Sequence, residues 1–242
     1  MIYIKENAIF IADAHENKNR RGFWKFLQAL KNNQIQTKQL FLMGDIFDLL
    51  IYEVKATHAF AKPYIELLEE LADNIEIIYL EGNHDFNLEK FFVKVKVYSI
   101  SKQPLVCEFE DIKRTKVKLA HGDIFLKPLL QFLLKSLRNH YLLYFLNFLN
   151  FICKEKITYE ILNSQEKKYL TRKISNFESL VKDRMKKYQM NFIIEGHYHQ
   201  DVFLKLDNIK YLNLATFAYK ESFFIVKYDS EIRFHKIELK EA

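Results

Sequence analysis

The hydrophobic pattern along the chain alternates between short apolar runs and longer amphipathic stretches. Five short runs are rich in Ile, Leu, Phe, Val and Tyr and are followed at once by polar or glycine-containing residues: 8–12, 39–43, 75–80, 117–120 and 191–194. Such runs are typical of buried strands. Phe23, Phe26, Leu27 and Leu30 share one helical face, and the apolar residues of 60–71 repeat at intervals of three and four. The alternation of strand and helix predicts an α/β fold.

The pattern changes after Gly196. Four apolar runs follow in close succession, at residues 202–206, 210–214, 222–228 and 231–237. Turn-forming pairs, Asp207-Asn208 and Asp229-Ser230, separate some of them. This spacing predicts a meander of short strands.

Residues 124–195 differ from the rest because they have helical periodicity throughout. Residues 125–153 are nearly all Leu, Phe, Tyr and Ile, and the apolar residues of 170–188 recur at helical spacing. The longest uncharged stretch, residues 141–153, is shorter than the ~20 residues of a spanning helix. We therefore predict a single domain, residues 1–242, with a helical lid inserted at about 124–190 that could lie on a membrane without crossing it.

Composition and charge narrow the class of protein. With 49% hydrophobic and 28% charged residues, the 242-residue chain is able to bury one ordinary core, which excludes disorder. The net charge is +6, but its source is local: residues 127–188 hold thirteen Lys or Arg against five Asp or Glu, and the remainder is slightly acidic. The basic excess therefore belongs to the helical insert.

The cysteines and the N-terminus bear on the cellular compartment. Cys107 and Cys153 lie far apart and form no CxxC motif, which supports neither a disulfide framework nor a thiolate zinc site. The first apolar run, residues 8–12, is too short for a signal-peptide core. We expect a cytoplasmic protein that is not exported.

Polar blocks stand at or just after the ends of all five predicted strands. They read DAH at 13–15, GDIFD at 44–48, GNHD at 82–85, HGD at 121–123 and GHYH at 196–199. Because ligands bind at the carboxyl ends of strands in open α/β sheets, these blocks should meet at one edge. Buried Asp, Asn and His are costly unless paired, so packing alone does not explain them.

These side chains suit a metal centre. Carboxylate, imidazole and amide oxygen without thiolate form a ligand set for divalent Mn, Fe or Zn. Seven ligands indicate two ions, and a pair ~3.5–4 Å apart needs one bridging carboxylate. Glycines beside Asp45, Asn83, His121 and His197 fit tight turns with close backbone approach.

The five blocks, in this order, resemble the calcineurin-like metallophosphoesterases. The resemblance covers nearly the whole chain and implies a four-layer α/β/β/α sandwich. It implies that Asp13, His15 and His199 hold one ion, that Asn83, His121 and His197 hold the other, and that Asp45 bridges them. It also implies that His84 faces the scissile phosphate and stabilises or protonates the leaving oxygen, with Asp85 behind it as the second catalytic residue. An imidazole beside a metal-held phosphate is a reasonable general acid.

Two carboxylates of the polar blocks and three histidines outside them have no metal-binding or catalytic assignment. We expect Asp48 and Asp123 to orient metal-bound histidines by accepting their far N–H groups. His58, His140 and His235 are assigned no role, because a lone histidine is usually a surface or hydrogen-bonded residue.

The insert is both apolar and basic, which suits a substrate with acyl chains and phosphates. Chain length, the position of the insert and the sequence around Asn83 resemble the UDP-2,3-diacylglucosamine diphosphatases of lipid A biosynthesis. That family implies attack on the α-phosphorus, releasing UMP and 2,3-diacylglucosamine 1-phosphate, with two Mn2+ ions (Fe or Zn as alternatives), on the inner face of the cytoplasmic membrane. The best-known branch has Arg where this chain has His84. From the residues alone, Lys167, Lys168 and Arg172, with Asn83, are candidate phosphate contacts.

Two alternatives remain. The same metal site serves nucleotide and nucleic-acid phosphodiesterases, and a charge of +6 attracts a polyanion. Nucleic-acid binding is nevertheless not expected. Nucleases usually pair basic residues with stacking aromatics on a polar groove, whereas the basic residues here interrupt leucine-rich helices. A non-enzymatic scaffold of the same fold would be marked by lost ligands, and none is missing. The apolar insert could also simply be a helix packed on the core.

Overall fold

The computed structural model describes residues 1–241 and contains two six-stranded sheets. The strands are β1 (Ile2–Ile4), β2 (Ile9–Ile11), β3 (Gln39–Leu42), β4 (Leu50–Ile51), β5 (Glu76–Leu80), β6 (Asp85–Phe86), β7 (Lys96–Tyr98), β8 (Leu105–Phe109), β9 (Lys116–Ala120), β10 (Phe192–Glu195), β11 (Val202–Leu206), β12 (Ile209–Asn213), β13 (Ser222–Tyr228) and β14 (Ile232–Glu238). The α-helices are α1 (Gly22–Lys31), α2 (His58–Leu71), α3 (Pro128–Leu137), α4 (His140–Ile152), α5 (Lys156–Glu166), α6 (Phe177–Tyr188) and α7 (Phe217–Lys220).

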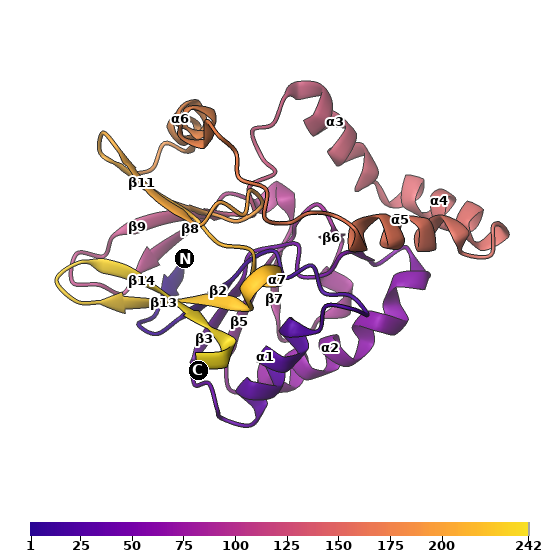
Figure 1. Cartoon of the computed structure of the whole chain (residues 1–242), viewed down its shortest axis with the longest axis horizontal. Helices are drawn as coiled ribbons and strands as arrows, with labels where there is room; N and C mark the ends of the chain where they lie inside the picture. Colours follow the sequence, from indigo (N-terminus) through magenta and orange to yellow (C-terminus); the bar gives the residue numbers. More distant parts are fainter. Residues whose placement is uncertain (242) are drawn as a thin grey trace.

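The two sheets face each other and are covered by helices on their outer sides (Figure 1). The β2 sheet has the order β14-β13-β2-β3-β5-β7, and the β10 sheet has the order β1-β8-β9-β10-β12-β11. Helices α1 and α2 cover the β2 sheet, and α6 covers the β10 sheet. The predicted four-layer α/β/β/α sandwich is therefore confirmed.

Strand alternation explains why both faces of the β2 sheet are buried. Phe10 and Phe41 point toward the β10 sheet, where their rings stack with centroids 4.5 Å apart. Their neighbours Ile9 and Leu40 point the other way, into the cluster with α1 and α2. Because successive side chains of a strand face opposite sides, apolar runs without alternation are required here. Full burial of each such side chain contributes about 1.5–3 kcal/mol.

Helix α6 forms the fourth layer through a conventional amphipathic stripe. Val181, Met185 and Tyr188 are buried against the β10 sheet. Arg184 on the same helix pairs with Glu195 at the end of β10, at 2.9 Å, and both side chains are buried. The last helix of the predicted insert is thus part of the sandwich core.

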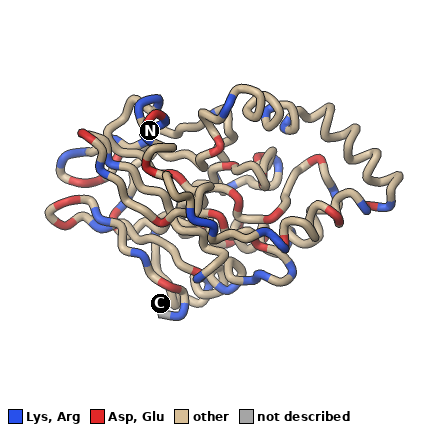
Figure 2. Tube along the Cα trace, turned by 45° about the horizontal axis from the view of Figure 1, so that its top comes forward, with Lys and Arg blue, Asp and Glu red and all other residues tan. Residues whose placement is uncertain are grey.

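Helices α3, α4 and α5, which we call the arm, extend away from the sandwich (Figure 1). Only Leu143 and Asn150 of α4 are buried, although the helix contains no charged residue. Leu143 contacts Ile51, Val54 and Phe86 and anchors the arm to the rest of the chain. Figure 2 shows α4 as a stretch without Lys, Arg, Asp or Glu, whereas α3 contains Lys135. Within residues 1–241, no helix combines the length and apolar character needed to cross a membrane.

The five strands expected from apolar runs form, as do helices at both amphipathic stretches. The predicted meander is wrong, since β11 pairs with β12 in the β10 sheet whereas β13 pairs with β14 in the β2 sheet. A meander pattern does not encode which sheet each hairpin joins. Short or half-exposed strands such as β1, β7 and β8 were not predicted, because their apolar runs span only two or three residues.

Candidate metal and phosphate site

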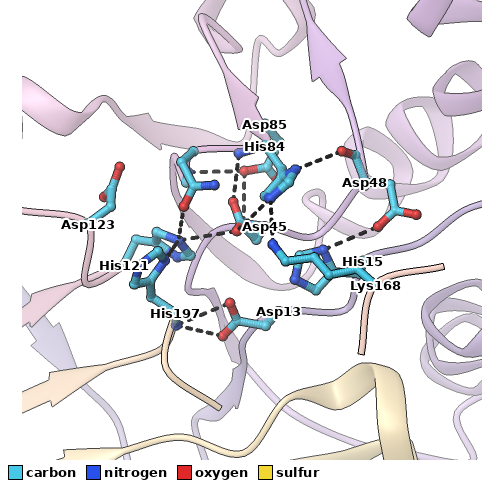
Figure 3. A network of polar contacts seen from close by, with 12 residues as sticks. Asp13, His15, Asp45, Asp48, His84, Asp85, His121, Asp123, Lys168 and His197 are labelled. Atoms are coloured by element: carbon cyan, nitrogen blue, oxygen red, sulfur yellow. Dashed lines mark hydrogen bonds and ion pairs between the residues drawn. The ribbon is translucent and has the colours of Figure 1, made fainter. Parts of the chain in front are cut away.

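The five polar blocks meet in space, but they come from two sheets rather than from one edge. Asp13, Asp45 and Asn83 follow β2, β3 and β5 of the β2 sheet. His121 and His197 follow β9 and β10 of the β10 sheet. The strand ends of both sheets open toward the same region, which corrects the single-edge expectation. Figure 3 shows the side chains gathered around Asp45.

One group of candidate ligands combines Asp13, His15 and His199. Their ligand atoms all lie within 4.8 Å of one another. Nε2 of His199 is 3.1 Å from Oδ1 of Asp13. The carboxylate of Asp13 also accepts a hydrogen bond from the backbone N–H of His197 at 2.9 Å, which links this group to the second.

The second group combines Asp45, His121 and His197, again within 4.8 Å. Nε2 of His121 lies 3.4 Å from Oδ2 of Asp45 and 3.3 Å from Oδ1 of Asn83. Asp45 also forms a cluster with His15 and His84, so its carboxylate lies between the two groups. Burial would raise the pKa of Asp45, but the His121 and His84 imidazoles outweigh this and hold the pKa well below its usual range.

The imidazoles are oriented as metal-binding histidines usually are. Nδ1 of His121 donates to the carbonyl of Met43 at 2.9 Å, and Nδ1 of His199 donates to the carbonyl of Leu170 at 2.7 Å. Nδ1 of His15 lies 3.2 Å from Oδ1 of Asp48. In the His121 and His199 rings Nδ1 is held by a backbone oxygen and Nε2 is left facing the site, which is the tautomer that binds metals. Nδ1 of His15 is near the Asp48 carboxylate but has no hydrogen-bond partner within residues 1–241.

The donor set fits divalent cations. Nε2 of His15 is buried and has no hydrogen-bond partner within residues 1–241. Carboxylates, imidazoles and an amide converge there without a thiolate, which is the set expected for Mn, Fe or Zn. An unpartnered buried nitrogen beside carboxylates is costly unless a ligand binds it.

Backbone strain and glycines bring these groups together. Asp13, His15, Asp45, His197 and His199 all have positive φ, between 46° and 62°. Non-glycine residues adopt this region uncommonly, and such residues concentrate at functional sites. A Cβ on Gly82 would lie 2.2 Å from Oδ1 of Asp45, and one on Gly196 would lie 2.6 Å from Oδ2 of Asp13. Glycine is therefore required where the backbone passes the carboxylates.

His84 lies at the same site, but Asp85 is turned away from it. Nδ1 of His84 donates to the carbonyl of Asp48 at 3.0 Å, and its Nε2 is 3.9 Å from Oδ2 of Asp45. Asp85 is fully buried and accepts from the backbone N–H groups of Asp45, Ile46 and Gly82. The contacts of Asp85 therefore stabilise the Asp45 loop, whereas the sequence analysis expected it behind the imidazole. Its catalytic role stays a prediction that these contacts do not support.

The two remaining carboxylates differ. Asp48 contacts His15 as expected, and it also pairs with Arg20 at 2.6 Å. Asp123 pairs instead with Arg138 at 2.9 Å, and Figure 3 shows it apart from the His121 ring. We expected Asp123 to orient a metal-bound histidine, and this expectation is wrong, because its partner is Arg138. Arg20 and Arg138 escaped the sequence analysis because neither belongs to a motif block.

Two of the three basic candidates reach the site. Lys168 and Arg172 line a cavity of about 220 Å3 together with His15, Asp45 and Asn83. Nζ of Lys168 is 3.3 Å from Nε2 of His84. Lys167 is exposed and is not among the residues that line this cavity. These residues belong to the segment after α5, which ends at Glu166. The segment lies beside the candidate ligands, because Lys168 and Arg172 line the cavity and the carbonyl of Leu170 accepts from His199.

The chain is similar to known proteins over most of its length. A UDP-2,3-diacylglucosamine hydrolase from Psychromonas ingrahamii is 28% identical over 202 residues, covering 79% of this chain and 80% of the relative. One from Wigglesworthia glossinidia brevipalpis is 26% identical over 216 residues, covering 85% and 84%. The solved structure of an archaeal phosphodiesterase aligns over 96% of this chain and 99% of that chain, with 13% identity and a TM-score of 0.46. The model of the calcineurin-like phosphoesterase family matches residues 7–201. The chain therefore belongs to the calcineurin-like phosphoesterase family, and it is a hydrolase.

Proposed function

We propose that this protein hydrolyses the pyrophosphate bond of UDP-2,3-diacylglucosamine, giving UMP and 2,3-diacylglucosamine 1-phosphate for lipid A biosynthesis. The observation that carries the proposal is the apolar arm beside a phosphoesterase metal site. The relatives support it, because they are named UDP-2,3-diacylglucosamine hydrolases and the similarity covers most of their length.

Two divalent ions, Mn2+ in our proposal and Fe or Zn as alternatives, would occupy the site. Asp13, His15 and His199 would hold one, Asn83, His121 and His197 would hold the other, and the Asp45 carboxylate lies between the two groups. Such a pair polarises a phosphate and supplies hydroxide from water near neutral pH.

The chain's own groups position the substrate diphosphate. Lys168 and Arg172 enter the cavity from the segment after α5 and bring positive charge to phosphate oxygens. Nδ1 of His84 is held by a carbonyl, which fixes the ring with Nε2 toward the cavity side of Asp45. His84 in this orientation is able to contact the leaving oxygen of the scissile phosphate.

The arm accounts for the lipid part of the substrate and for a location on the inner face of the cytoplasmic membrane. Tyr141, Phe148 and Phe151 of α4 are 86%, 58% and 74% exposed. An apolar surface of this kind on a soluble domain marks a binding surface. The basic residues of the same segment complement anionic headgroups. This surface also distinguishes the proposal from a nucleic-acid phosphodiesterase, which would need a polar groove with stacking aromatics.

The test is a Mn2+-supplemented assay of the full chain on UDP-2,3-diacylglucosamine, with unacylated UDP-glucosamine as the matched control. Release of UMP from the acylated compound alone supports the proposal. Hydrolysis of a chromogenic diester or of DNA, without turnover of either UDP-sugar, would keep the metal site and reject the lipid substrate.

A further inference from the structure

A second cavity, of about 650 Å3, lies between α3 and the sandwich. We call it the α3 pocket. Residues of α3 and its C-terminal end line one side, among them Gln131, Leu134 and Arg138. Residues that follow β5, β7 and β9 line the other side, among them Glu81, Ser101, Gln103 and Asp123. The pocket adjoins the metal site, because Asp123 follows His121 by two residues and Arg138 donates to the carbonyl of Gly82 at 2.8 Å. The α3 pocket therefore lies next to the loops that carry the candidate ligands Asn83 and His121.

Helix α3 has its polar face toward the pocket and its apolar face toward solvent. Gln131, Leu134, Lys135 and Arg138 follow helical spacing and line the pocket. On other sides of the helix, Leu129, Phe132 and Leu133 are 72%, 67% and 50% exposed. A surface helix of a soluble protein normally has the reverse arrangement. The polar face is explained if the pocket holds a polar ligand, while acyl chains and membrane meet the opposite face.

The wall that the pocket shares with the metal site has unsatisfied polar atoms. Asp123 and Arg138 pair through Oδ2 and an Nη atom, and their side chains are 0% and 10% exposed. Oδ1 of Asp123 and Nε of Arg138 have no hydrogen-bond partner in the described part of the chain. One is an acceptor and the other a donor. A ligand that presents both a hydroxyl or N–H group and an oxygen satisfies both.

The charged groups that line the pocket are nearly balanced, with a slight acidic excess. Four carboxylates line it, against three Lys or Arg side chains: Glu53, Glu81, Glu89 and Asp123 against Lys90, Lys135 and Arg138. Such a balance does not favour an anion. The lining is mixed, since Ile100, Ile124, Phe125 and Leu134 lie beside these charged groups. Acyl chains are attached directly to the glucosamine ring, and the exposed apolar surface of the arm is available to them.

From these observations we infer that the α3 pocket binds the nucleoside of the substrate, an uncharged group with hydroxyls, N–H and carbonyl oxygens. This inference rests on the proposed function, because it takes UDP-2,3-diacylglucosamine as the substrate. It places the uridine under α3, the diphosphate at the metal site and the acyl chains against the arm.

The test fills the pocket and measures uridine binding and turnover separately. Ser101→Trp places an indole at the exposed rim of the pocket, and Gln131→Trp does the same from α3. Ser230→Trp, in the exposed turn between β13 and β14, is the matched control. Saturation-transfer NMR with uridine on the full chain reports binding without any phosphate. Activity is measured on UDP-2,3-diacylglucosamine and on a chromogenic diester that lacks a nucleoside.

We expect uridine to bind the unmodified and Ser230→Trp proteins, and either pocket substitution to abolish this signal. We also expect the pocket substitutions to lower kcat/KM for the UDP-lipid about tenfold or more while diester hydrolysis stays unchanged. Absence of uridine binding, or an unchanged kcat/KM for the UDP-lipid in both filled variants, overturns the inference and leaves the proposed function standing. Uridine binding that the pocket variants remove, in a protein that does not hydrolyse the UDP-lipid, supports the pocket and rejects the proposed substrate.

Discussion

The ammonium group of Lys168 lies 3.3 Å from Nε2 of His84, so a residue from the segment after α5 contacts the imidazole that follows Asn83. Because Nδ1 of His84 donates to the Asp48 carbonyl, Nε2 is the acceptor in this contact. Burial, His15 and Lys168 together lower the pKa of His84 below its usual value. This lowering favours an imidazole that accepts the contact from the Lys168 ammonium group.

The substitution Lys168→Gln tests this charge. We expect it to lower kcat/KM for a diphosphate substrate by about 10-fold to 100-fold, because a charge-assisted contact to phosphate is lost. Lys167→Gln is the matched control, since Lys167 is exposed and outside the cavity lining. Steady-state kinetics measure both variants. Equal effects of the two substitutions would show that only the overall charge of the segment matters.

The substitution His84→Ala separates catalysis from metal binding. Because His84 contacts Asp48 and lies beside Asp45, its loss should lower kcat by about 100-fold while the protein still binds two ions. Elemental analysis of the purified variant gives the metal content. A variant that loses its metal would mean that His84 is a ligand.

The substitution Asp45→Asn removes the charge between the two ligand groups. The Asp45 carboxylate belongs to clusters with His15, His84, His121 and His197, so its loss should weaken both ion sites and abolish nearly all turnover. Isothermal titration with Mn2+ follows binding, and chelation of the unmodified protein should reproduce the loss of activity. Full activity in this variant would contradict the metal assignment.

The arm should bind anionic, acyl-bearing vesicles through its apolar surface. The double substitution Phe145→Glu and Phe148→Glu places charge on two exposed aromatic positions of α4 and should abolish co-sedimentation. Phe203→Glu on β11, at an equally exposed aromatic position of the sandwich, is the control. Deletion of residues 125–190 is unsuitable for this purpose, because α6 packs on the β10 sheet. Unchanged sedimentation of the double variant would reject the arm as the membrane contact.

The buried pair of Arg184 and Glu195 predicts a large effect on stability. Arg184 also donates to the carbonyls of Gly122 and Ile124, which follow His121. Arg184→Ala leaves Glu195 buried with only the hydroxyl donors of Tyr188 and Tyr211 and should lower the free energy of unfolding by about 3–5 kcal/mol. Urea denaturation measures this difference. A loss below about 1 kcal/mol would mean that the pair contributes no more than a surface ion pair.

The apolar runs of the sequence were sufficient to predict the five strands that precede the polar blocks, and these blocks predicted the seven candidate ligands through the family resemblance they carry. Runs such as 39–43 encode burial directly, and Asp45 follows at the strand end. The contacts that orient the ligands were not predictable, because they join residues distant in sequence. The carbonyl of Leu170 holds His199, and Arg20 holds Asp48. For the same reason, the sequence did not reveal that the insert divides into an exposed arm and a core helix. That division depends on the packing of α6 against the β10 sheet, which includes strands distant in sequence such as β9.

The most direct test of the central claim is hydrolysis of UDP-2,3-diacylglucosamine in 18O-labelled water, with mass spectrometry of both products. The proposed attack on the α-phosphorus predicts one 18O atom in UMP and an unlabelled 2,3-diacylglucosamine 1-phosphate. Label in the sugar phosphate instead, or no cleavage of the pyrophosphate by the metal-loaded protein, would contradict the account.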